Sequence, residues 1–201
     1  MVHAADRTSA RRESRAKLAM MARYVAFLRG INLGAKRRVP MEELRRVLEE
    51  AGYDDVRTLA QSGNVVLSSG ATAAALERDL ATTLQDAFGL GIGVVVRSHA
   101  ELADVVARDP IGSHADDPAR YQVSFLSAEP EPARVRELER ADVAPERVAV
   151  LGREVYAWHP NGVGRSELAK LITDRRLGVE VTARNWRTVT KLLELASQAD
   201  E

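Results

Sequence analysis

RYVAFLRGINLGAKRRVPMEELRRVLEEAG, residues 23–52, is the stretch that decides the fold of the first half of the chain. Its apolar run at residues 24–28, bounded by charged residues, predicts a buried strand. The next segment, GINLGAKRRVP at residues 30–40, combines glycines, basic residues and a proline, and it predicts a loop. Apolar residues three and four positions apart then predict a helix over residues 41–51 that begins after Pro40 and ends at Gly52.

The residues after Gly52 complete a recognisable unit. Residues 55–61 and 64–69 predict two strands joined by the tight turn Ser62-Gly63-Asn64. Residues 71–89 then predict a helix, and residues 92–97 a last strand. The order β-α-β-β-α-β is that of a ferredoxin-like unit, which has a four-stranded antiparallel sheet with two helices on one face.

The second half repeats this order more weakly. A connecting helix is predicted over residues 99–109, and the loop after it is rich in turn-forming and acidic residues. We then expect a strand at 120–127, a helix at 130–141, a hairpin at 146–159 that turns at Gly152-Arg153, a helix at 165–178, a strand at 179–184 and a final helix at 185–197. The likeness of YVAFLRGIN (24–32) to YQVSFLSAE (121–129) suggests internal duplication.

The fold class that these patterns predict is α+β, with two tandem ferredoxin-like (βαββαβ) halves, antiparallel sheets and a C-terminal helix. We expect a basic, flexible arm at residues 1–21, a first half at 22–98, a connecting helix and loop at 99–119, and a second half with the C-terminal helix at 120–201. A single mixed sheet built from both halves is the structural alternative.

Composition limits the function classes. Lys plus Arg and Asp plus Glu both total 29, so no overall charge attracts nucleic acid or membrane, and an electrostatic site needs local clustering. The absence of cysteine excludes disulfides, thiol catalysis and thiolate metal sites, and it fits a reducing, cytoplasmic location. No apolar run reaches the ~18 residues of a membrane helix.

The first twenty residues have no apolar core, so they do not resemble a secretory signal. Two interpretations stay open for them. Either the translation start lies at Met20 or Met21, or the segment is a basic arm that contacts an anionic partner.

Two loop clusters in the first half are candidate ligand-binding sites. The first contains Arg29, Gly30, Asn32, Gly34 and Lys36, whose glycines precede a helix N-terminus suited to anions. The alternative is an ordinary loop with solvated charges, because the spacing matches neither a Walker motif nor G-x-G-x-x-G.

The second cluster is Gln61, Ser62, Gly63 and Asn64, which a hairpin turn explains without any function. In a ferredoxin-like unit this turn and the first loop lie at the same end of the sheet. The topology therefore makes a joint site plausible.

Two more clusters lie in the second half. Gly164, Arg165 and Ser166 form either an anion-binding turn or the N-cap of the next helix.

The last cluster is Arg184, Asn185 and Trp186. Asn185 can cap the final helix, Arg184 is a candidate anion clamp, and Trp186 is either a core residue or a stacking platform.

The sequence has no pattern that assigns a catalytic residue, a cofactor or a metal. The histidines lack H-x-x-x-H and H-E-x-x-H spacing, and there is no G-x-S-x-G elbow. His114 lies near Asp116 and Asp117, which is more typical of a solvated acidic loop than of a metal site.

Two long stretches resemble one bacterial family. Residues 23–69 are similar to the opening of the family known as domain of unknown function 1697, and GVGRSELAKLITDRRLGVEVTARNWRTVTKLLELA (162–196) is similar to its closing signature. The resemblance covers residues from about Ala22 to about Ala196 and implies paired ferredoxin-like halves. It implies no activity and transfers no catalytic residue. The family's Lys-Leu after the serine is replaced here by Glu167-Leu168.

Three functional hypotheses are consistent with these patterns. The first is a binding module for an anionic ligand, which could be a nucleotide, a phosphorylated metabolite or nucleic acid. The second is an enzyme of unknown reaction that acts on a polar or phosphorylated small molecule. The third is a structural or protein-interaction module. The sequence predicts no membrane partner and no particular oligomeric state.

Overall fold

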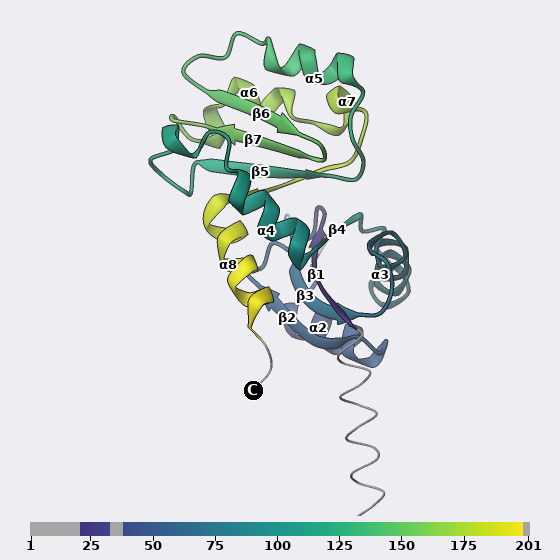
Figure 1. Ribbon diagram of the computed structural model, residues 1–201. Helices are drawn as coiled ribbons and strands as arrows, with labels where there is room; N and C mark the ends of the chain where they lie inside the picture. The colour runs from purple at the N-terminus through teal and green to yellow at the C-terminus, as the bar shows by residue number, and fades with distance from the viewer. Residues whose placement is uncertain (1–20, 33–37, 199–201) are drawn as a thin grey trace, which may run out of the picture.

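The computed structural model describes residues 21–32 and 38–198. Residues 1–20 of the predicted basic arm, as well as Gly34 and Lys36, lie outside the described residues. Within the described part the chain has two four-stranded antiparallel sheets and seven α-helices, so the α+β class is confirmed (Figure 1). The alternative of a single mixed sheet is wrong.

The first half contains β1 (Ala22–Leu28), α2 (Met41–Glu50), β2 (Asp54–Leu59), β3 (Asn64–Ser69), α3 (Ala73–Phe88) and β4 (Val94–Ser98). Its strands lie in the order β2-β3-β1-β4. Alternate residues of β1, such as Ala26 and Leu28, pack with Leu44 of α2 and Leu80 of α3. The two helices therefore bury one face of the sheet.

The second half repeats the order with different helices. It contains β5 (Tyr121–Leu126), α5 (Pro132–Glu139), β6 (Arg147–Leu151), β7 (Glu154–Trp158), α6 (Glu167–Leu171), α7 (Asp174–Leu177) and β8 (Val181–Asn185), with short 3-10 turns η1 (Gly112–His114) and η2 (Val163–Arg165). The strand order is β6-β7-β5-β8, which corresponds strand for strand to that of the first sheet.

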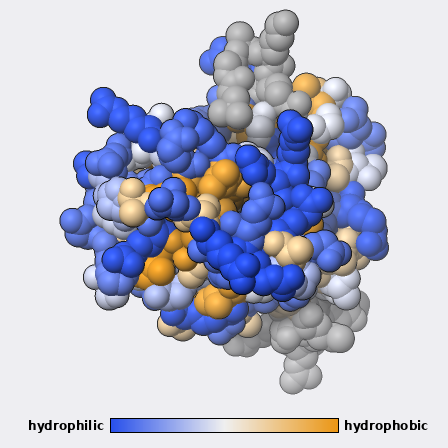
Figure 2. All heavy atoms as spheres, turned by 90° about the horizontal axis from the view of Figure 1, so that it is seen from above, coloured by the Kyte–Doolittle hydropathy of each residue, from blue (hydrophilic) through white to orange (hydrophobic). Residues whose placement is uncertain are grey.

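The single helix predicted over residues 165–178 is wrong. Ile172 leaves the helical conformation with ψ at 76°, and the Thr173 hydroxyl accepts a hydrogen bond from the Arg176 N–H, which starts α7. A five-residue helix and a four-residue helix thus stand where the first half has the sixteen residues of α3. The buried cluster on this side has six residues, compared with sixteen on the corresponding side of the first half, so the sheet is less completely covered. Seen from above, apolar residues show between hydrophilic ones on the surface (Figure 2).

The two halves pack together through a central layer. Helices α4 (His99–Arg108) and α8 (Trp186–Ser197) lie against each other beside the sheets (Figure 1). The faces of the sheets that α2, α3 and α5–α7 do not cover contribute to one buried cluster with these helices. At its centre Phe27 of β1 stacks on Phe125 of β5. No helix in the described part of the chain is long and apolar enough to cross a membrane.

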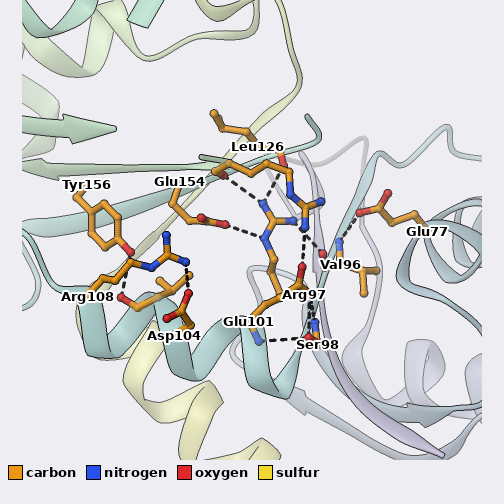
Figure 3. Close-up of polar contacts among 12 residues, drawn as sticks. Glu77, Val96, Arg97, Ser98, Glu101, Asp104, Arg108, Leu126, Glu154 and Tyr156 are labelled. Atoms are coloured by element: carbon orange, nitrogen blue, oxygen red, sulfur yellow. Dashed lines mark hydrogen bonds and ion pairs between the residues drawn. The ribbon is translucent and has the colours of Figure 1, made fainter. Parts of the chain in front are cut away.

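Two buried arginines cross this layer in opposite directions. Arg97 of β4 donates from Nε to Glu154 at the start of β7, and from Nη2 to the Leu126 carbonyl (Figure 3). Arg184 of β8 donates from Nε to Asn64 at the start of β3, and from Nη2 to the Leu28 carbonyl. Each half therefore binds the other through the same strand positions.

Candidate functional site

A cavity of about 900 Å³ lies where the two halves meet, and we call it the inter-half cavity. Four segments form it: the end of β1 and the loop after it, the β2–β3 turn, the loop between α3 and β4, and β8. Its lining residues are Leu28, Arg29, Gly30, Ile31, Asn32, Gln61, Ser62, Gly91, Gly93, Glu180, Val181, Thr182, Ala183 and Arg184.

Gly63 allows the β2–β3 turn to approach the end of β1. Its φ is +74°, and its carbonyl accepts a 2.8 Å hydrogen bond from the Leu28 N–H. A Cβ at this position would lie 2.7 Å from the Ile31 Cδ1 atom and 2.8 Å from the Leu28 Cβ atom. The close approach therefore requires glycine.

The Asn32 side chain holds the loop in place. Its Oδ1 accepts a 2.8 Å hydrogen bond from the Val39 N–H, and its Nδ2 donates to the Val39 and Gln61 carbonyls. Asn32 has a left-handed backbone with φ at 55°, a conformation that asparagine tolerates better than most residues. Both the amide oxygen and the amide nitrogen of Asn32 are therefore hydrogen-bonded to the backbone, and Asn32 holds the shape of the cavity wall.

Arg29 links the two halves at the rim of the cavity. Nε donates to the Val181 carbonyl over 3.0 Å, and the guanidinium pairs with Asp174 at 2.5 Å and with Glu180 at 3.1 Å. Both carboxylates are about half exposed, with side-chain exposures of 52% and 51%. Partners this exposed hold the guanidinium weakly.

Arg184 forms a buried wall of the cavity. Besides Asn64 and Leu28, its guanidinium donates to the Thr182 hydroxyl and to the Ser62 carbonyl. No carboxylate among the described residues pairs with it. Burial lowers the pKa of Arg184 to about 10, so the group is still charged at neutral pH.

The corresponding arginine of the other half differs in one respect. Arg97 is paired with the Glu154 carboxylate at 2.8 Å, and both side chains are buried (Figure 3). Burial lowers the pKa of Arg97, and the charge of Glu154 opposes that shift. Asn64, which has no charge, occupies in the first half the place that Glu154 has in the second. The positive charge of Arg184 is therefore left without a counter-charge.

The structure brings part of the predicted site together. Of the sequence candidates, the cavity lining includes Arg29, Gly30, Asn32, Gln61, Ser62 and Arg184. Gly63 and Asn64 lie directly behind this lining, through their contacts with Leu28 and Arg184.

The remaining described candidates lie elsewhere. Gly164 and Arg165 belong to η2 and are exposed, while Ser166 caps α6 by accepting from the Ala169 N–H. The Asn185 side chain accepts a hydrogen bond from the Thr188 N–H and so caps α8, as the sequence predicted.

Trp186 stacks on Tyr121 with ring centroids 4.8 Å apart. It packs against the central cluster and does not line the inter-half cavity.

Sequence reasoning missed Gly91, Gly93 and Glu180. Gly91 and Gly93 lie in the loop just before β4. Arg29 packs over Gly93, where an added Cβ would lie 3.1 Å from the Arg29 Cδ atom. The glycine pair was a visible signal in the sequence. No pattern in the sequence marks Glu180 as a cavity residue, because its position beside Arg29 depends on how the two halves pack together.

No group of three or more histidine, aspartate or glutamate side chains in the described ranges is arranged to hold a metal ion. The inter-half cavity instead offers an arginine rim, a buried cation and hydroxyl and amide groups. Such a lining suits hydrogen bonding to an anion or a polar molecule.

The family model for a protein of unknown function, DUF1697, matches residues 21–156, from β1 to β7. The chain belongs to the DUF1697 family. The match includes Arg29 and Asn32 of the cavity lining and Asn64 behind it, whereas Arg184 and the predicted closing signature lie beyond the match.

This DUF1697 member also resembles a solved structure, the conserved bacterial protein SP0830 from Streptococcus pneumoniae. The TM-score is 0.73 at 22% sequence identity, over 88% of this chain and 99% of the other. At that identity the likeness shows a shared fold. No curated protein matches the sequence.

Proposed function

We propose that this protein binds a small anionic ligand, such as a nucleotide or a phosphorylated metabolite, in the inter-half cavity. The observation that carries the proposal is Arg184, a guanidinium with 9% exposure that has no carboxylate partner among the described residues. A buried charge without a counter-charge raises the potential of the cavity beside it. An anion in that cavity would supply the missing negative charge.

Arg29 supports the proposal as the direct contact. All the guanidinium N–H groups of Arg184 donate hydrogen bonds to protein acceptors. Arg184 therefore acts on a ligand through the positive electrostatic potential that it creates in the cavity. The two carboxylates that pair with Arg29 are half-exposed, and exposed ion pairs contribute about 0–1 kcal/mol. A phosphate group can displace Glu180 and accept two parallel hydrogen bonds from the Arg29 guanidinium.

Isothermal titration calorimetry with adenosine monophosphate, adenosine triphosphate and inorganic pyrophosphate, at low salt, tests the proposal. We expect at least one of them to bind, and Arg29→Ala to weaken its affinity at least tenfold. Arg46→Ala is the matched control, because Arg46 is exposed on α2 and its pairing with Glu50 stays within one helix. Absence of binding by all three probes, or equal weakening by both variants, would overturn the proposal.

A further titration, with a single-stranded oligonucleotide as the probe, tests for nucleic-acid binding. A single-stranded oligonucleotide that bound more tightly than the nucleotides, with an affinity falling steeply as salt rises, would indicate several phosphate contacts. That result would contradict a small-molecule cavity. If none of the probes, including the oligonucleotide, bound the protein, the result would favour the hypothesis of a structural or protein-interaction module.

We further propose that each half is a ferredoxin-like unit and that the two arose by duplication. The strand orders β2-β3-β1-β4 and β6-β7-β5-β8 support this proposal, as do Arg97 and Arg184 at corresponding strand positions. A cytoplasmic location stays a prediction.

A further inference from the structure

A second cavity, of about 570 Å³, lies on the face of the second sheet that α6 and α7 cover incompletely, and we call it the sheet-face cavity. Val181 and Ala183 of β8 line both this cavity and the inter-half cavity. Because β8 is an edge strand of its sheet, the two cavities meet along the free edge of β8. A ligand held in the inter-half cavity can therefore extend across this edge onto the face of the sheet.

An open hydrogen-bond donor lies on the free edge of β8. The Val181 N–H donates to Asp174 Oδ1 over 2.8 Å and the Val181 carbonyl accepts from Arg29 Nε over 3.0 Å, so both groups point away from β5. Residues two apart in a strand point their N–H groups the same way, which turns the Ala183 N–H to this edge as well. No described residue accepts a hydrogen bond from the Ala183 N–H.

The first half fills the corresponding position with a side chain. Val96 of β4 pairs with Ala26, the residue before Phe27. Ala183 pairs in the same way with Ser124, the residue before Phe125. The Val96 N–H donates to Glu77 Oε1 of α3 over 2.8 Å (Figure 3). Two short helices replace α3 in the second half, so an oxygen of a bound molecule fits where the first half has the Glu77 carboxylate.

Ser124 places a hydroxyl beside this edge. The residue is 3% exposed, and its hydroxyl neither has a hydrogen-bond partner among the described residues nor belongs to the buried polar atoms sealed from solvent. Since Ser124 lines the sheet-face cavity, the hydroxyl opens into it. Gln122, two residues along β5, leaves the same face of the sheet and lines the same cavity. A buried hydroxyl with unused hydrogen-bonding capacity points to a polar occupant.

His159 marks the far end of the sheet-face cavity. It is 1% exposed, and its Nδ1 lies 2.9 Å from Glu146 Oε1 and 2.8 Å from the Ser166 hydroxyl. Ser124 pairs with Val155, and His159 follows Val155 by four residues, so His159 and Ser124 are ~13 Å apart along the sheet. A single sugar ring bound at Ser124 therefore does not reach His159.

The charges and side chains of the two linings favour an uncharged group bound beside the edge of β8. Asp174 is already paired with Arg29, and Arg175, which also lines the sheet-face cavity, is exposed, so water solvates its charge. Among the described residues, neither lining includes a phenylalanine, tyrosine or tryptophan that would stack on a nucleobase. The sheet-face cavity thus suits hydroxyl groups better than a second anion or a base.

We propose that the ligand is a sugar phosphate, with its phosphate against Arg29 in the inter-half cavity and its hydroxyl groups in the sheet-face cavity. The inference rests on the proposed function, because Arg29 binds a phosphate group in both. One sugar oxygen accepts from the Ala183 N–H, and a second bonds to the Ser124 hydroxyl. Val181, which contacts Arg29, is ~7 Å along the strand from Ala183, so one small molecule spans both contacts.

Isothermal titration calorimetry at low salt with methyl phosphate, ribose 5-phosphate and adenosine monophosphate tests the proposal. The first probe is a phosphate with a methyl group, the second replaces the methyl group by a sugar, and the third adds a base to the sugar. We expect ribose 5-phosphate to bind at least fivefold more tightly than methyl phosphate, and adenosine monophosphate to bind no more than threefold more tightly than ribose 5-phosphate.

The same titrations separate the inference from the proposed function. If methyl phosphate bound and ribose 5-phosphate gained less than fivefold over it, the inference would be wrong and the phosphate site would stand. If none of the three probes bound, both would be wrong. A gain of more than threefold from the base would assign the sheet-face cavity to a nucleotide and overturn the inference.

Ser124→Ala locates the sugar. Alanine fits this position, since Ala26 occupies the corresponding place in the first half. We expect the variant to lose at least threefold in affinity for ribose 5-phosphate and to keep its affinity for methyl phosphate. Ser68→Ala is the matched control, because Ser68 is also buried and lies on β3 outside both cavity linings. Equal affinities of the two variants for ribose 5-phosphate would contradict the placement of the sugar.

Ala183→Pro removes the N–H on the edge of β8. Proline is tolerated on an edge strand where the N–H faces away from the sheet, and near-UV circular dichroism establishes that the variant folds. We expect it to bind ribose 5-phosphate at least threefold more weakly, with methyl phosphate unaffected. A folded Ala183→Pro variant with full affinity for ribose 5-phosphate would contradict the hydrogen bond to this N–H. If the variant does not fold, the result for Ser124→Ala decides the placement alone.

Discussion

Phe27 of β1 and Phe125 of β5 stack with their ring centroids 4.0 Å apart and their planes within 15° of parallel. The two rings occupy corresponding positions, because Phe27 pairs with Asn64 of β3 as Phe125 pairs with Glu154 of β7. A guanidinium from the opposite half lies over each ring, with Arg184 at 5.5 Å from the centroid of Phe27. The halves are thus joined by two aromatic rings between two cations, an arrangement that is stabilising when desolvated.

The paired charge at Arg97 leads to the first prediction. Glu154→Ala leaves Arg97, which is 1% exposed, without its counter-charge, and we expect a loss of about 3–5 kcal/mol in the free energy of unfolding. Glu154→Gln keeps an oxygen that can accept from Nε, as Asn64 does for Arg184, so we expect a smaller loss of about 1–3 kcal/mol. Urea denaturation measures both.

The control for this pair is Glu137→Ala, which removes an exposed ion pair with Arg176 and is expected to cost about 0–1 kcal/mol. Equal losses for Glu154→Ala and Glu154→Gln would contradict the claim that an amide can replace the carboxylate at this position.

The unpaired charge at Arg184 leads to the second prediction. Asn64→Asp places a carboxylate beside the guanidinium and neutralises it, so we expect the affinity of the bound nucleotide probe to fall at least fivefold. The substitution also removes the Nδ2 donations to Leu59 and Ser62, so we expect a stability loss of about 1–3 kcal/mol. Calorimetry and urea denaturation separate the two effects.

Asn161→Asp is the matched control, since it adds the same charge at an exposed position outside the inter-half cavity lining. If both substitutions reduced the affinity equally, the net charge of the protein and not the field of Arg184 would explain the effect.

Glycine geometry leads to the third prediction. Gly63 and Gly52 both have positive φ, at +74° and +89°, but an added Cβ meets Ile31 and Leu28 at Gly63 and nothing within 4 Å at Gly52. We expect Gly52→Ala to cost about 1–2 kcal/mol from the backbone alone. Gly63→Ala should cost about 1–3 kcal/mol more, because the packing must shift as well. Thermal and urea denaturation of both variants provide the comparison, and equal costs would contradict the close contact at Gly63.

The order of strands along the chain was predictable because hydrophobic periodicity and turn residues are local signals. The split between α6 and α7 was missed because Ile172 continues the apolar stripe of the helix. Thr173 followed by Asp174 was the available signal for a new N-cap. Local sequence patterns therefore predict the presence of a helix or strand more reliably than they predict the residue at which it ends.

The partners in the candidate sites were less predictable, because they depend on docking between distant segments. Arg184 was a candidate anion clamp in the sequence, yet its role as a buried link to Asn64 requires the packing of β8 on the first half. The same limit applies to His159, whose partner Glu146 precedes it by thirteen residues and follows no motif spacing.

The partly buried carboxylate of Glu146 leads to the last prediction, which concerns the stability of the protein at low pH. Hydrogen bonds hold the pKa of Glu146 below its ordinary value of 4.5, although burial alone raises it. Because the folded-state pKa is the lower one, the unfolded chain binds the proton first as the pH falls. The stabilisation is therefore fully present above pH 4.5 and is lost as the pH drops through the folded-state pKa.

Urea denaturation between pH 7 and pH 3 tests this prediction. Glu146→Gln should lose less stability over this range than the protein without substitutions. Glu167→Gln, at an exposed position of α6, is the control and should lose as much as the protein without substitutions. Parallel curves for all three would mean that Glu146 has the same pKa in the folded and unfolded chains, and that its hydrogen bonds to α6 and His159 do not favour the ionised form.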